Sequence, residues 1–424
     1  MPDGCIFVYN NISKMDIQGF STKVIHTAYT KNDAHNTLQM PIYSNAAFEF
    51  ESAEYMEEVF LGHHPDHTYS RISNPTVENF ERRIISITGA LGVSALSSGM
   101  AAISSVFFTV TQTGSNIITS RNLFGNTYSF LTSTLNSFGV EVRFCDLNNI
   151  EDVYRNIDEN TAAIFFETIT NPQLEVVNIE DLSEVAKNNQ VLLIADTTLT
   201  PPNIFNASKF GINIEVISST KIISGGATSI GGIIVDYGTY GWSHNKKLAE
   251  SARKFGPYAF NVKLRKEIQR NLGACLSPFN AYLQSLGLET LDLRFGKAAS
   301  NCLKIAEYLQ NENAIKQVNY PGLTTSSFFD IGIKQFGKYP GAMLTINFET
   351  RQESFNFINK LKVIRRATNI YDNKSVIIHP ASTIFCDFSY ETRQKIGVPD
   401  TLLRLSVGIE DVNDLIDDIS NSLH

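Results

Sequence analysis

Between about residues 75 and 240, short apolar runs alternate with amphipathic stretches. Each run is flanked by turn residues, and one intervening stretch, IEDLSEVAKNNQ (179–190), has the pattern of a crossover helix. Runs of this length with helical segments between them are typical of parallel strands in an α/β sheet. The sequence therefore predicts an α/β fold with a mostly parallel central sheet, built on these runs: SNIITS (115–120), AAIFFE (162–167), VLLIAD (191–196), IEVISST (214–220) and GGIIVD (231–236).

The pattern changes at both ends of this region. Residues 15–70 are rich in Asn, Tyr and His with little periodicity, which indicates an extended arm. Residues 241–310 have a helical pattern, and from about 311 a strand-like segment (342–348) and a terminal amphipathic helix follow. For 424 residues, two or three domains are expected. We predict an N-terminal arm (1–70), a large domain (71–275) and a C-terminal α/β domain (276–424).

Charge and cysteine content exclude several functions. The net charge of −8 argues against nucleic-acid or anionic-membrane partners, because both need a basic surface. Residues 84–120 carry no charge and are long enough to span a bilayer, but glycines and hydroxyl residues interrupt them, so we expect buried helix, glycine loop and strand. Five scattered cysteines without a CxxC pair, and no secretory signal, predict a reducing, cytoplasmic location.

Chemically competent residues follow the predicted strands. Asp196 ends one strand, Lys221 follows the next, and the loop LSSGMAA (96–102) precedes a helix. Ligands of open α/β sheets bind beyond the carboxyl ends of the strands. We therefore expect the lysine, the carboxylate and the start of the helix to converge on one edge of the sheet.

These three groups together suit an aldehyde cofactor that carries a phosphate. A lysine amine forms a Schiff base with an aldehyde, and a carboxylate can hold a pyridine nitrogen protonated. A helix N-terminus binds phosphate, and Ser218 and Thr220 could add hydroxyls. Each group also has a simpler interpretation: a solvated lysine, a capping aspartate and a turn glycine. The segment GGATSIGG (225–232) lacks the spacing of a nucleotide-binding loop.

Nine segments, in order along the chain, resemble the Cys/Met-metabolism family of fold-type-I pyridoxal-phosphate enzymes, which have the aspartate-aminotransferase-like fold. The resemblance covers about residues 19–424. Within that family, the sequence is most similar to the O-acetylhomoserine sulfhydrylases, through TSIGG after the lysine loop and through residues 271–294. The segments are FSTKVIH (20–26), PIYSNAAFEFESAE (41–54), YSRISNPT (69–76), SSGMAAI (97–103), ETITNP (167–172), ADTTLTPP (195–202), SSTKIISGGATSIGG (218–232), HPAST (379–383) and RLSVGIED (404–411).

The resemblance implies a role for each matching residue. Lys221 would form the Schiff base with pyridoxal 5'-phosphate and carry protons, and Asp196 would pair with the pyridine nitrogen. Tyr69 and Arg71 would reach the cofactor phosphate of a neighbouring subunit, Tyr69 with a catalytic role as well. The remaining implied positions are Gly99, Met100, Ser218 and Thr220 at the phosphate, Phe124 and Thr198 at the ring, Asn171 at the phenolic oxygen, and Arg404 and Asn369 at the substrate carboxylate.

Some positions depart from the family pattern. Phe124 stands where a ring-stacking tyrosine is usual, so it can stack but cannot transfer a proton. Ile217 replaces a common histidine, Tyr371 replaces a usual glycine, and residues 384–386 (IFC) replace a usual polar turn. These last changes border the expected substrate entrance. They therefore affect the choice of substrate and sulfur donor more than the cofactor.

Other histidines have simpler explanations. The segment GHHPDH (62–67) is expected to be an exposed loop, and no metal site is predicted. His379 is expected to be a packed, hydrogen-bonded residue rather than a catalyst.

The resemblance implies γ-replacement on O-acetyl-L-homoserine, with sulfide or a thiol, giving homocysteine or methionine and acetate. A methionine or cystathionine γ-lyase, or a cystathionine γ-synthase, on the same scaffold is the alternative. A non-catalytic pyridoxal-phosphate-binding protein is a third possibility, which retention of Lys221, Asp196 and Arg404 together argues against. The expected partners are the amino-acid substrate, a sulfur donor and further copies of the chain, as a dimer of dimers with shared sites.

Overall fold

A computed structural model describes residues 18–27 and 35–424. In this part of the chain a seven-stranded sheet forms the larger layer, with strand order β1-β7-β6-β5-β4-β2-β3. Strands β2 to β6 run parallel to one another, whereas β7 is antiparallel to both β6 and β1. The strands are β1 (Gly92–Leu96), β2 (Asn116–Thr119), β3 (Glu141–Phe144), β4 (Thr161–Glu167), β5 (Leu192–Asp196), β6 (Ile214–Ile217) and β7 (Gly232–Asp236).

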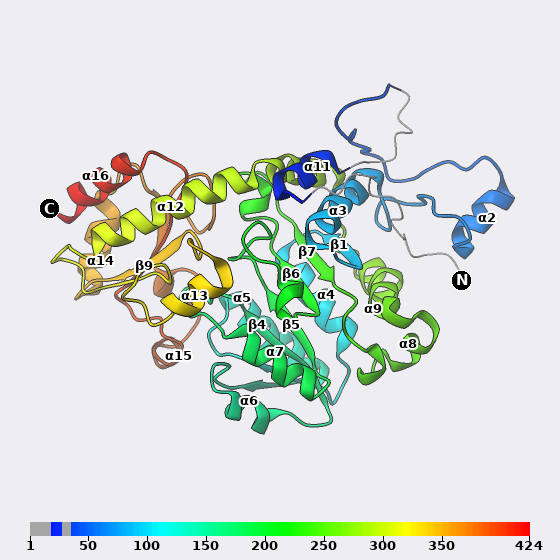
Figure 1. Ribbon diagram of the computed structural model, residues 1–424, viewed down its shortest axis with the longest axis horizontal. Helices are drawn as coiled ribbons and strands as arrows, with labels where there is room; N and C mark the ends of the chain where they lie inside the picture. The colour runs from blue at the N-terminus through cyan, green and yellow to red at the C-terminus, as the bar shows by residue number, and fades with distance from the viewer. Residues whose placement is uncertain (1–17, 28–34) are drawn as a thin grey trace.

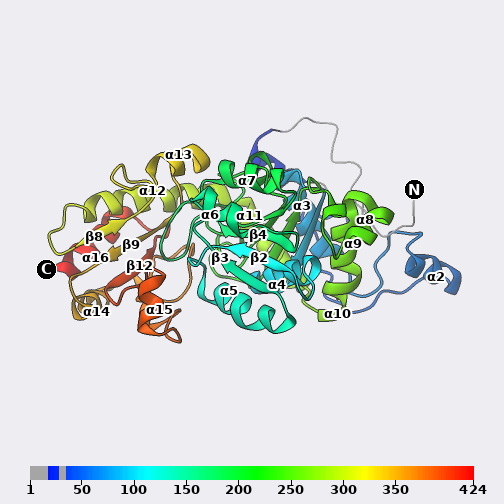
Figure 2. The same cartoon turned by 90° about the horizontal axis from the view of Figure 1, so that it is seen from below.

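Both faces of this sheet are buried. Along β4, Ile164 and Phe166 belong to one hydrophobic core, while Ala163 and Phe165 belong to another. Successive side chains of a strand point to opposite faces, so the two cores lie on opposite sides of the sheet. Figure 2 shows α3 and α7 on one side and α4 and α5 on the other. The helices around this sheet are α3 (Pro75–Thr88), α4 (Gly99–Val110), α5 (Gly125–Ser129), α6 (Ile150–Asn156), α7 (Ile179–Asn188), α8 (Ala249–Phe255), α9 (Ala259–Lys263) and α10 (Arg270–Leu272).

A smaller sheet lies toward the C-terminus. Its five strands have the order β10-β11-β12-β9-β8, antiparallel except for β10 with β11. Figure 1 shows α12 running from the large sheet to the small one. The strands are β8 (Gln317–Asn319), β9 (Met343–Asn347), β10 (Arg365–Arg366), β11 (Val376–Ile378) and β12 (Leu402–Ser406). The helices are α11 (Pro278–Glu289), α12 (Leu291–Leu309), α13 (Phe329–Phe336), α14 (Arg351–Lys360), α15 (Tyr390–Lys395) and α16 (Val412–Leu423).

The predicted α/β class and mostly parallel sheet are confirmed. The five predicted runs form strands β2, β4, β5, β6 and β7, and the predicted crossover helix is α7. One detail is wrong, because GGIIVD forms the antiparallel β7 rather than a parallel strand. Its direction follows from the short connection through residues 218–231, which returns the chain without a crossover helix.

The uncharged stretch 84–120 is divided among the end of α3, β1, α4 and β2. None of the helices in residues 18–27 and 35–424 is long and apolar enough to cross a membrane. Of the predicted arm, the structure describes α1 (Phe20–His26) and α2 (Ala53–Leu61), and α2 lies away from both sheets (Figure 1). The expectation of a loose extension at residues 1–14 falls outside the described residues, and the domain boundaries stay a prediction.

Candidate active site

A cavity of about 380 Å³ lies beyond the carboxyl ends of β4, β5 and β6, between the two sheets. Its walls include most of the residues predicted for the site. Most of them come from the ends of strands of the large sheet, from the loops that follow these strands and from the start of α4, as expected for an open α/β sheet, while Arg404 comes from the small sheet. The predicted residues that line the cavity are Gly99, Met100, Phe124, Asn171, Asp196, Thr198, Ser218, Thr220, Lys221 and Arg404.

Lys221 follows β6 and lies partly buried in this cavity. Its Nζ donates a hydrogen bond of 3.1 Å to Oδ1 of Asn369, and Nδ2 of Asn369 donates one of 3.1 Å to Asp372. The pKa of Lys221 is lowered to about 8, chiefly by burial and also by the charge of Arg404, while the charge of Asp372 acts in the opposite direction. A lysine with such a pKa has a substantial neutral fraction near pH 8, as a nucleophilic amine requires.

Two carboxyl groups that line the cavity end the neighbouring strands β4 and β5. Asp196 is paired with Glu167 in the ladder between β5 and β4. Oδ1 of Asp196 accepts the backbone N–H of Thr198 at 2.9 Å. Desolvation raises the pKa of both groups, and the charge of Asp196 raises that of Glu167 further. A cation placed against Asp196 would therefore relieve an electrostatic cost that the protein alone leaves in place.

Glu167 is a residue of this site that the sequence interpretation missed. Its Oε1 accepts the N–H of Phe124 at 2.6 Å, and its Oε2 accepts the N–H of Asn171 at 3.2 Å. One carboxyl group thus holds the backbone of two predicted site residues. The signal was present, because Glu167 ends the run AAIFFE just as Asp196 ends VLLIAD.

The start of α4 forms one end of the cavity. Ser98 caps the helix by accepting the N–H of Ala101 at 3.0 Å, and the first N–H groups of a helix have no partner within it. A Cβ at Gly99 would lie 2.7 Å from Cβ of Ser218, so only glycine permits this close approach. Thr220 lines the same cavity, and its hydroxyl donates to the carbonyl of Gly231 and accepts the N–H of Gly231, both at 3.1 Å. This end therefore combines a helix dipole with hydroxyl groups, which suits a phosphate.

Arg404 on β12 is a buried cation without a carboxylate partner among the described residues, with 2% of its surface exposed. Its Nη1 donates to Oδ1 of Asn171 at 3.0 Å. Its Nη2 donates to the carbonyls of Thr368 and Asn369, at 3.3 and 3.4 Å. Burial lowers the pKa of Arg404 to about 9, and its Nε lacks a hydrogen-bond partner in residues 18–27 and 35–424. A buried guanidinium with neutral partners is suited to an incoming anion such as a carboxylate.

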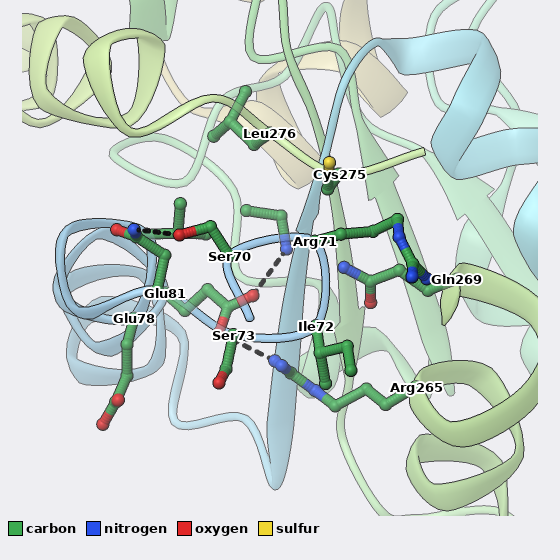
Figure 3. A pocket seen from close by; sticks show the side chains of 13 residues that line it. Ser70, Arg71, Ile72, Ser73, Glu78, Glu81, Arg265, Gln269, Cys275 and Leu276 are labelled. Atoms are coloured by element: carbon green, nitrogen blue, oxygen red, sulfur yellow. Dashed lines mark hydrogen bonds and ion pairs between the residues drawn. The ribbon is translucent and has the colours of Figure 1, made fainter. Parts of the chain in front are cut away.

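Tyr69 and Arg71 lie outside this cavity. Tyr69 is 44% exposed, and the guanidinium of Arg71 lies 5.5 Å from its ring centre. Nη1 of Arg71 donates to the carbonyl of Arg270 at 2.7 Å. Figure 3 shows Arg71 beside the ion pair between Glu81 and Arg265. A single chain does not bring these residues to Lys221, and their predicted role toward a neighbouring subunit stays a prediction.

His379 is packed and hydrogen-bonded, as predicted. It is 4% exposed and bonds to the Ser382 hydroxyl and the Asp400 carbonyl, at 2.8 and 2.7 Å. Phe124 lines the cavity, which is consistent with its expected stacking role.

These residues fit pyridoxal phosphate. Lys221 supplies the amine, Asp196 a desolvated carboxyl for the ring nitrogen, and the start of α4 a phosphate site. Arg404, a buried guanidinium with only neutral partners among the described residues, supplies a positive charge for the carboxylate of an amino acid.

Comparison with known proteins agrees with this arrangement. The chain is 34% identical to an O-acetyl-L-homoserine sulfhydrylase of Corynebacterium glutamicum, over 97% of this chain and 98% of the relative. It is also 34% identical to an L-methionine gamma-lyase of Fusobacterium nucleatum, over 96% of this chain and 98% of that relative. A Campylobacter jejuni structure assigned as an O-acetylhomoserine (thiol)-lyase superposes with a TM-score of 0.89 at 31% identity, covering 96% of this chain and 100% of that one.

That structure contains N'-pyridoxyl-lysine-5'-monophosphate. Residues 21–424 of the present chain match the family described as Cys/Met metabolism PLP-dependent enzyme. The match spans nearly the whole chain and includes both sheets. The chain therefore belongs to the Cys/Met metabolism family of PLP-dependent enzymes.

Proposed function

We propose that this enzyme catalyses γ-replacement on O-acetyl-L-homoserine, with sulfide or a thiol as the second substrate. The observation that carries the proposal is the buried guanidinium of Arg404, which faces the Lys221 cavity and has only neutral partners among the described residues. It suits the α-carboxylate of an amino acid. The similarity to the sulfhydrylase of Corynebacterium glutamicum supports the choice of substrate.

Pyridoxal phosphate, when bound, supplies a protonated ring that accepts the electron pair left at Cα of the substrate. Asp196 keeps the ring nitrogen protonated, because a buried carboxylate stabilises an adjacent cation. Lys221, whose pKa is about 8, removes the proton from Cα and moves protons at Cβ. Acetate leaves from Cγ, and the sulfur nucleophile forms its bond at the same carbon.

Arg404 and Asn171 orient the substrate so that its Cα lies near Lys221. Asn369 holds Lys221 and Arg404 in fixed positions relative to each other. Its Oδ1 accepts a hydrogen bond from Nζ of Lys221, and its backbone carbonyl accepts one from Arg404. Phe124, Ile370 and Ile384 make part of the cavity wall apolar. Apolar walls exclude water, which favours addition of the sulfur nucleophile over hydrolytic loss of the four-carbon unit.

A γ-lyase is the second candidate, supported by the 34% identity to the methionine gamma-lyase of Fusobacterium nucleatum. Product analysis separates the two. Formation of 2-oxobutanoate and ammonia without a thiol identifies a lyase, whereas cystathionine formed with cysteine identifies a cystathionine synthase.

The proposal extends to assembly and location. The enzyme would be a dimer of dimers in which Tyr69 and Arg71 of one subunit complete the site of its partner. Their separation from Lys221 within one chain, and the exposure of Tyr69, are consistent with such sharing. A cytoplasmic location is consistent with the free thiols at Cys145, Cys275, Cys302 and Cys386.

The test is an absorbance titration of the purified protein with O-acetyl-L-homoserine, with and without sulfide. We expect a visible cofactor band that changes with the amino acid and recovers as homocysteine and acetate appear. Lys221→Ala should lose this band and its activity, while Lys209→Ala, an exposed lysine of the same domain, should keep both. Release of acetate by Lys221→Ala at the wild-type rate would overturn the proposal.

A further inference from the structure

Tyr371 lies one residue beyond the cavity wall, in a backbone conformation that is unusual for its side chain. Its φ is 52°, in the left-handed region, and the residue is 1% exposed. A bulky side chain reaches this region only when its surroundings compensate for the strain. The contacts of the side chain must therefore stabilise this conformation.

The phenol connects the two sheets. Its hydroxyl donates to the carbonyl of Leu199, 172 positions away, at 2.8 Å. The same hydroxyl accepts the N–H of Ala342, next to β9, at 3.1 Å. Leu199 follows β5 of the large sheet and lines the cavity, whereas Ala342 precedes a strand of the small sheet. The hydroxyl thus donates one hydrogen bond and accepts another, and the two partners lie next to strands of different sheets.

Further contacts fix the backbone and the ring. The N–H of Tyr371 donates to the hydroxyl of Ser406 at 2.8 Å, and the ring packs edge-on against Phe295, with ring centres 6.1 Å apart. A Cβ at Gly341 would lie 2.7 Å from the Tyr371 hydroxyl, so glycine makes room for it. Burial raises the pKa of Tyr371, which therefore stays neutral and takes no part in proton transfer near neutral pH.

The segment held in this way, residues 368–372, carries groups that face Lys221 and Arg404. Asn369 contributes the oxygen that accepts from Nζ of Lys221. The carbonyls of Thr368 and Asn369 accept from Nη2 of Arg404. A shift of this segment would therefore move the acceptor of the lysine and the acceptors of the arginine together.

We propose that Tyr371 is a positioning residue, whose hydroxyl bridges Leu199 and Ala342 and so sets residues 368–372 against Lys221 and Arg404. Its effect on catalysis rests on the proposed function. Its effect on the lysine does not, because the contact between Asn369 and Lys221 needs no substrate. Removing the hydroxyl should weaken substrate binding and lower the pKa of Lys221, since an acceptor that stabilises the ammonium is displaced.

The test compares Tyr371→Phe with Tyr320→Phe in the full-length enzyme. Tyr320 is a matched control: it is fully buried, and its hydroxyl donates at 2.9 Å to the carbonyl of Gly341, the residue before Ala342. Two quantities are measured. The first is KM and kcat for O-acetyl-L-homoserine. The second is the pH dependence of Lys221 acylation in the cofactor-free protein, followed by peptide mass spectrometry.

We expect Tyr371→Phe to raise KM by about five- to fiftyfold, with a smaller change in kcat, because buried partners lose their hydrogen bonds. The midpoint for Lys221 should fall by about half a pH unit or more. Tyr320→Phe should change only thermal stability. Ser406→Ala removes the acceptor of the Tyr371 N–H and should shift KM and the Lys221 midpoint in the same direction as Tyr371→Phe. If Tyr371→Phe does not fold, Ser406→Ala provides the test of the positioning role.

A Tyr371→Phe protein with wild-type KM and lysine midpoint, changed only in stability like Tyr320→Phe, would overturn the proposal. Failure of the proposed function has a different signature. The wild type would not turn over O-acetyl-L-homoserine, while the lysine midpoints of wild type and Tyr371→Phe would still differ.

Discussion

Glu167 and Asp196 end adjacent parallel strands as direct ladder partners, and they place two carboxyl groups side by side at the wall of one cavity. Their tasks differ. Glu167 accepts two backbone N–H groups, whereas Asp196 accepts one, from Thr198, and also lines the cavity. Glu167 therefore holds the backbone of two site residues, whereas Asp196 is the carboxyl group that we propose to pair with the ring nitrogen of the cofactor.

Glu167→Gln should weaken cofactor binding. Glutamine has one carbonyl oxygen, so its NH₂ group would oppose either the N–H of Phe124 or that of Asn171. We expect the Kd for pyridoxal phosphate to rise by roughly tenfold or more, measured by titration of the cofactor-free protein. Glu215→Gln is the control, because this buried carboxyl meets two hydroxyls, of Thr197 and Tyr237, which can reverse their hydrogen bonds. Equal Kd values for the two variants would contradict this role of Glu167.

Arg404→Lys should raise KM for the amino acid by roughly 10- to 100-fold, because an ammonium cannot bind a carboxylate through two parallel hydrogen bonds. Steady-state kinetics measure the change. Arg143→Lys, which alters an arginine paired with Glu141 and Asp158, should leave KM unchanged. An unchanged KM in Arg404→Lys would show that the substrate carboxylate binds elsewhere.

The rate of cofactor attachment should depend on pH through Lys221. Its pKa of about 8 means that the reactive amine accumulates as pH rises toward and above this value. Asp372→Asn removes a charge that raises this pKa, so the rate profile should move to lower pH. Stopped-flow absorbance after adding pyridoxal phosphate measures the profile. The exposed Asp330→Asn is the control, and coincident profiles for wild type and Asp372→Asn would refute the coupling.

Asp236→Asn should change how stability depends on pH. Burial raises the pKa of Asp236 to about 7, above its ordinary value of 3.8. The stabilisation from its protonated form is therefore complete below about pH 4 and is lost as pH rises through about 7. Asparagine does not ionise, and the amide of Asn261, which donates to Asp236 at 2.6 Å, can rotate to accept instead.

Relative to wild type, Asp236→Asn should gain up to about 3 kcal/mol in free energy of unfolding between pH 5 and pH 8. Urea unfolding at the two pH values measures this. A constant difference between the two proteins would show that Asp236 does not titrate in this range.

The proposed sharing of active sites between subunits predicts complementation between inactive variants. Arg71→Ala and Lys221→Ala should each be nearly inactive, but a mixed dimer regains one site with both residues intact. After co-expression, about one quarter of the wild-type activity is expected, because half of random dimers are hybrids with one functional site each. Activity no higher than that of either variant alone would place Arg71 outside the partner's site.

Much of the site follows from local patterns. The runs that form β4, β5 and β6 are short, apolar and flanked by turn residues, so their type and the position of Asp196 and Lys221 at their ends could be predicted. The general rule for open α/β sheets then predicted that these ends meet. The resemblance to the family supplied Asn171, Asn369 and Arg404, which periodicity alone would not have found.

Tertiary structure decided the rest. Local patterns depend on neighbours within a few residues, whereas the partner of Lys221 lies 148 positions away and that of Arg404 lies 233 positions away. Those pairs exist only because the small sheet packs beside the large one. The left-handed backbone of Tyr371 likewise depends on packing, since its hydroxyl bonds to Leu199, which follows a strand of the large sheet, and to Ala342, which precedes a strand of the small one. The sequence by itself determined the chemical groups and the strands that carry them, and only the packing of the two sheets decided which groups meet.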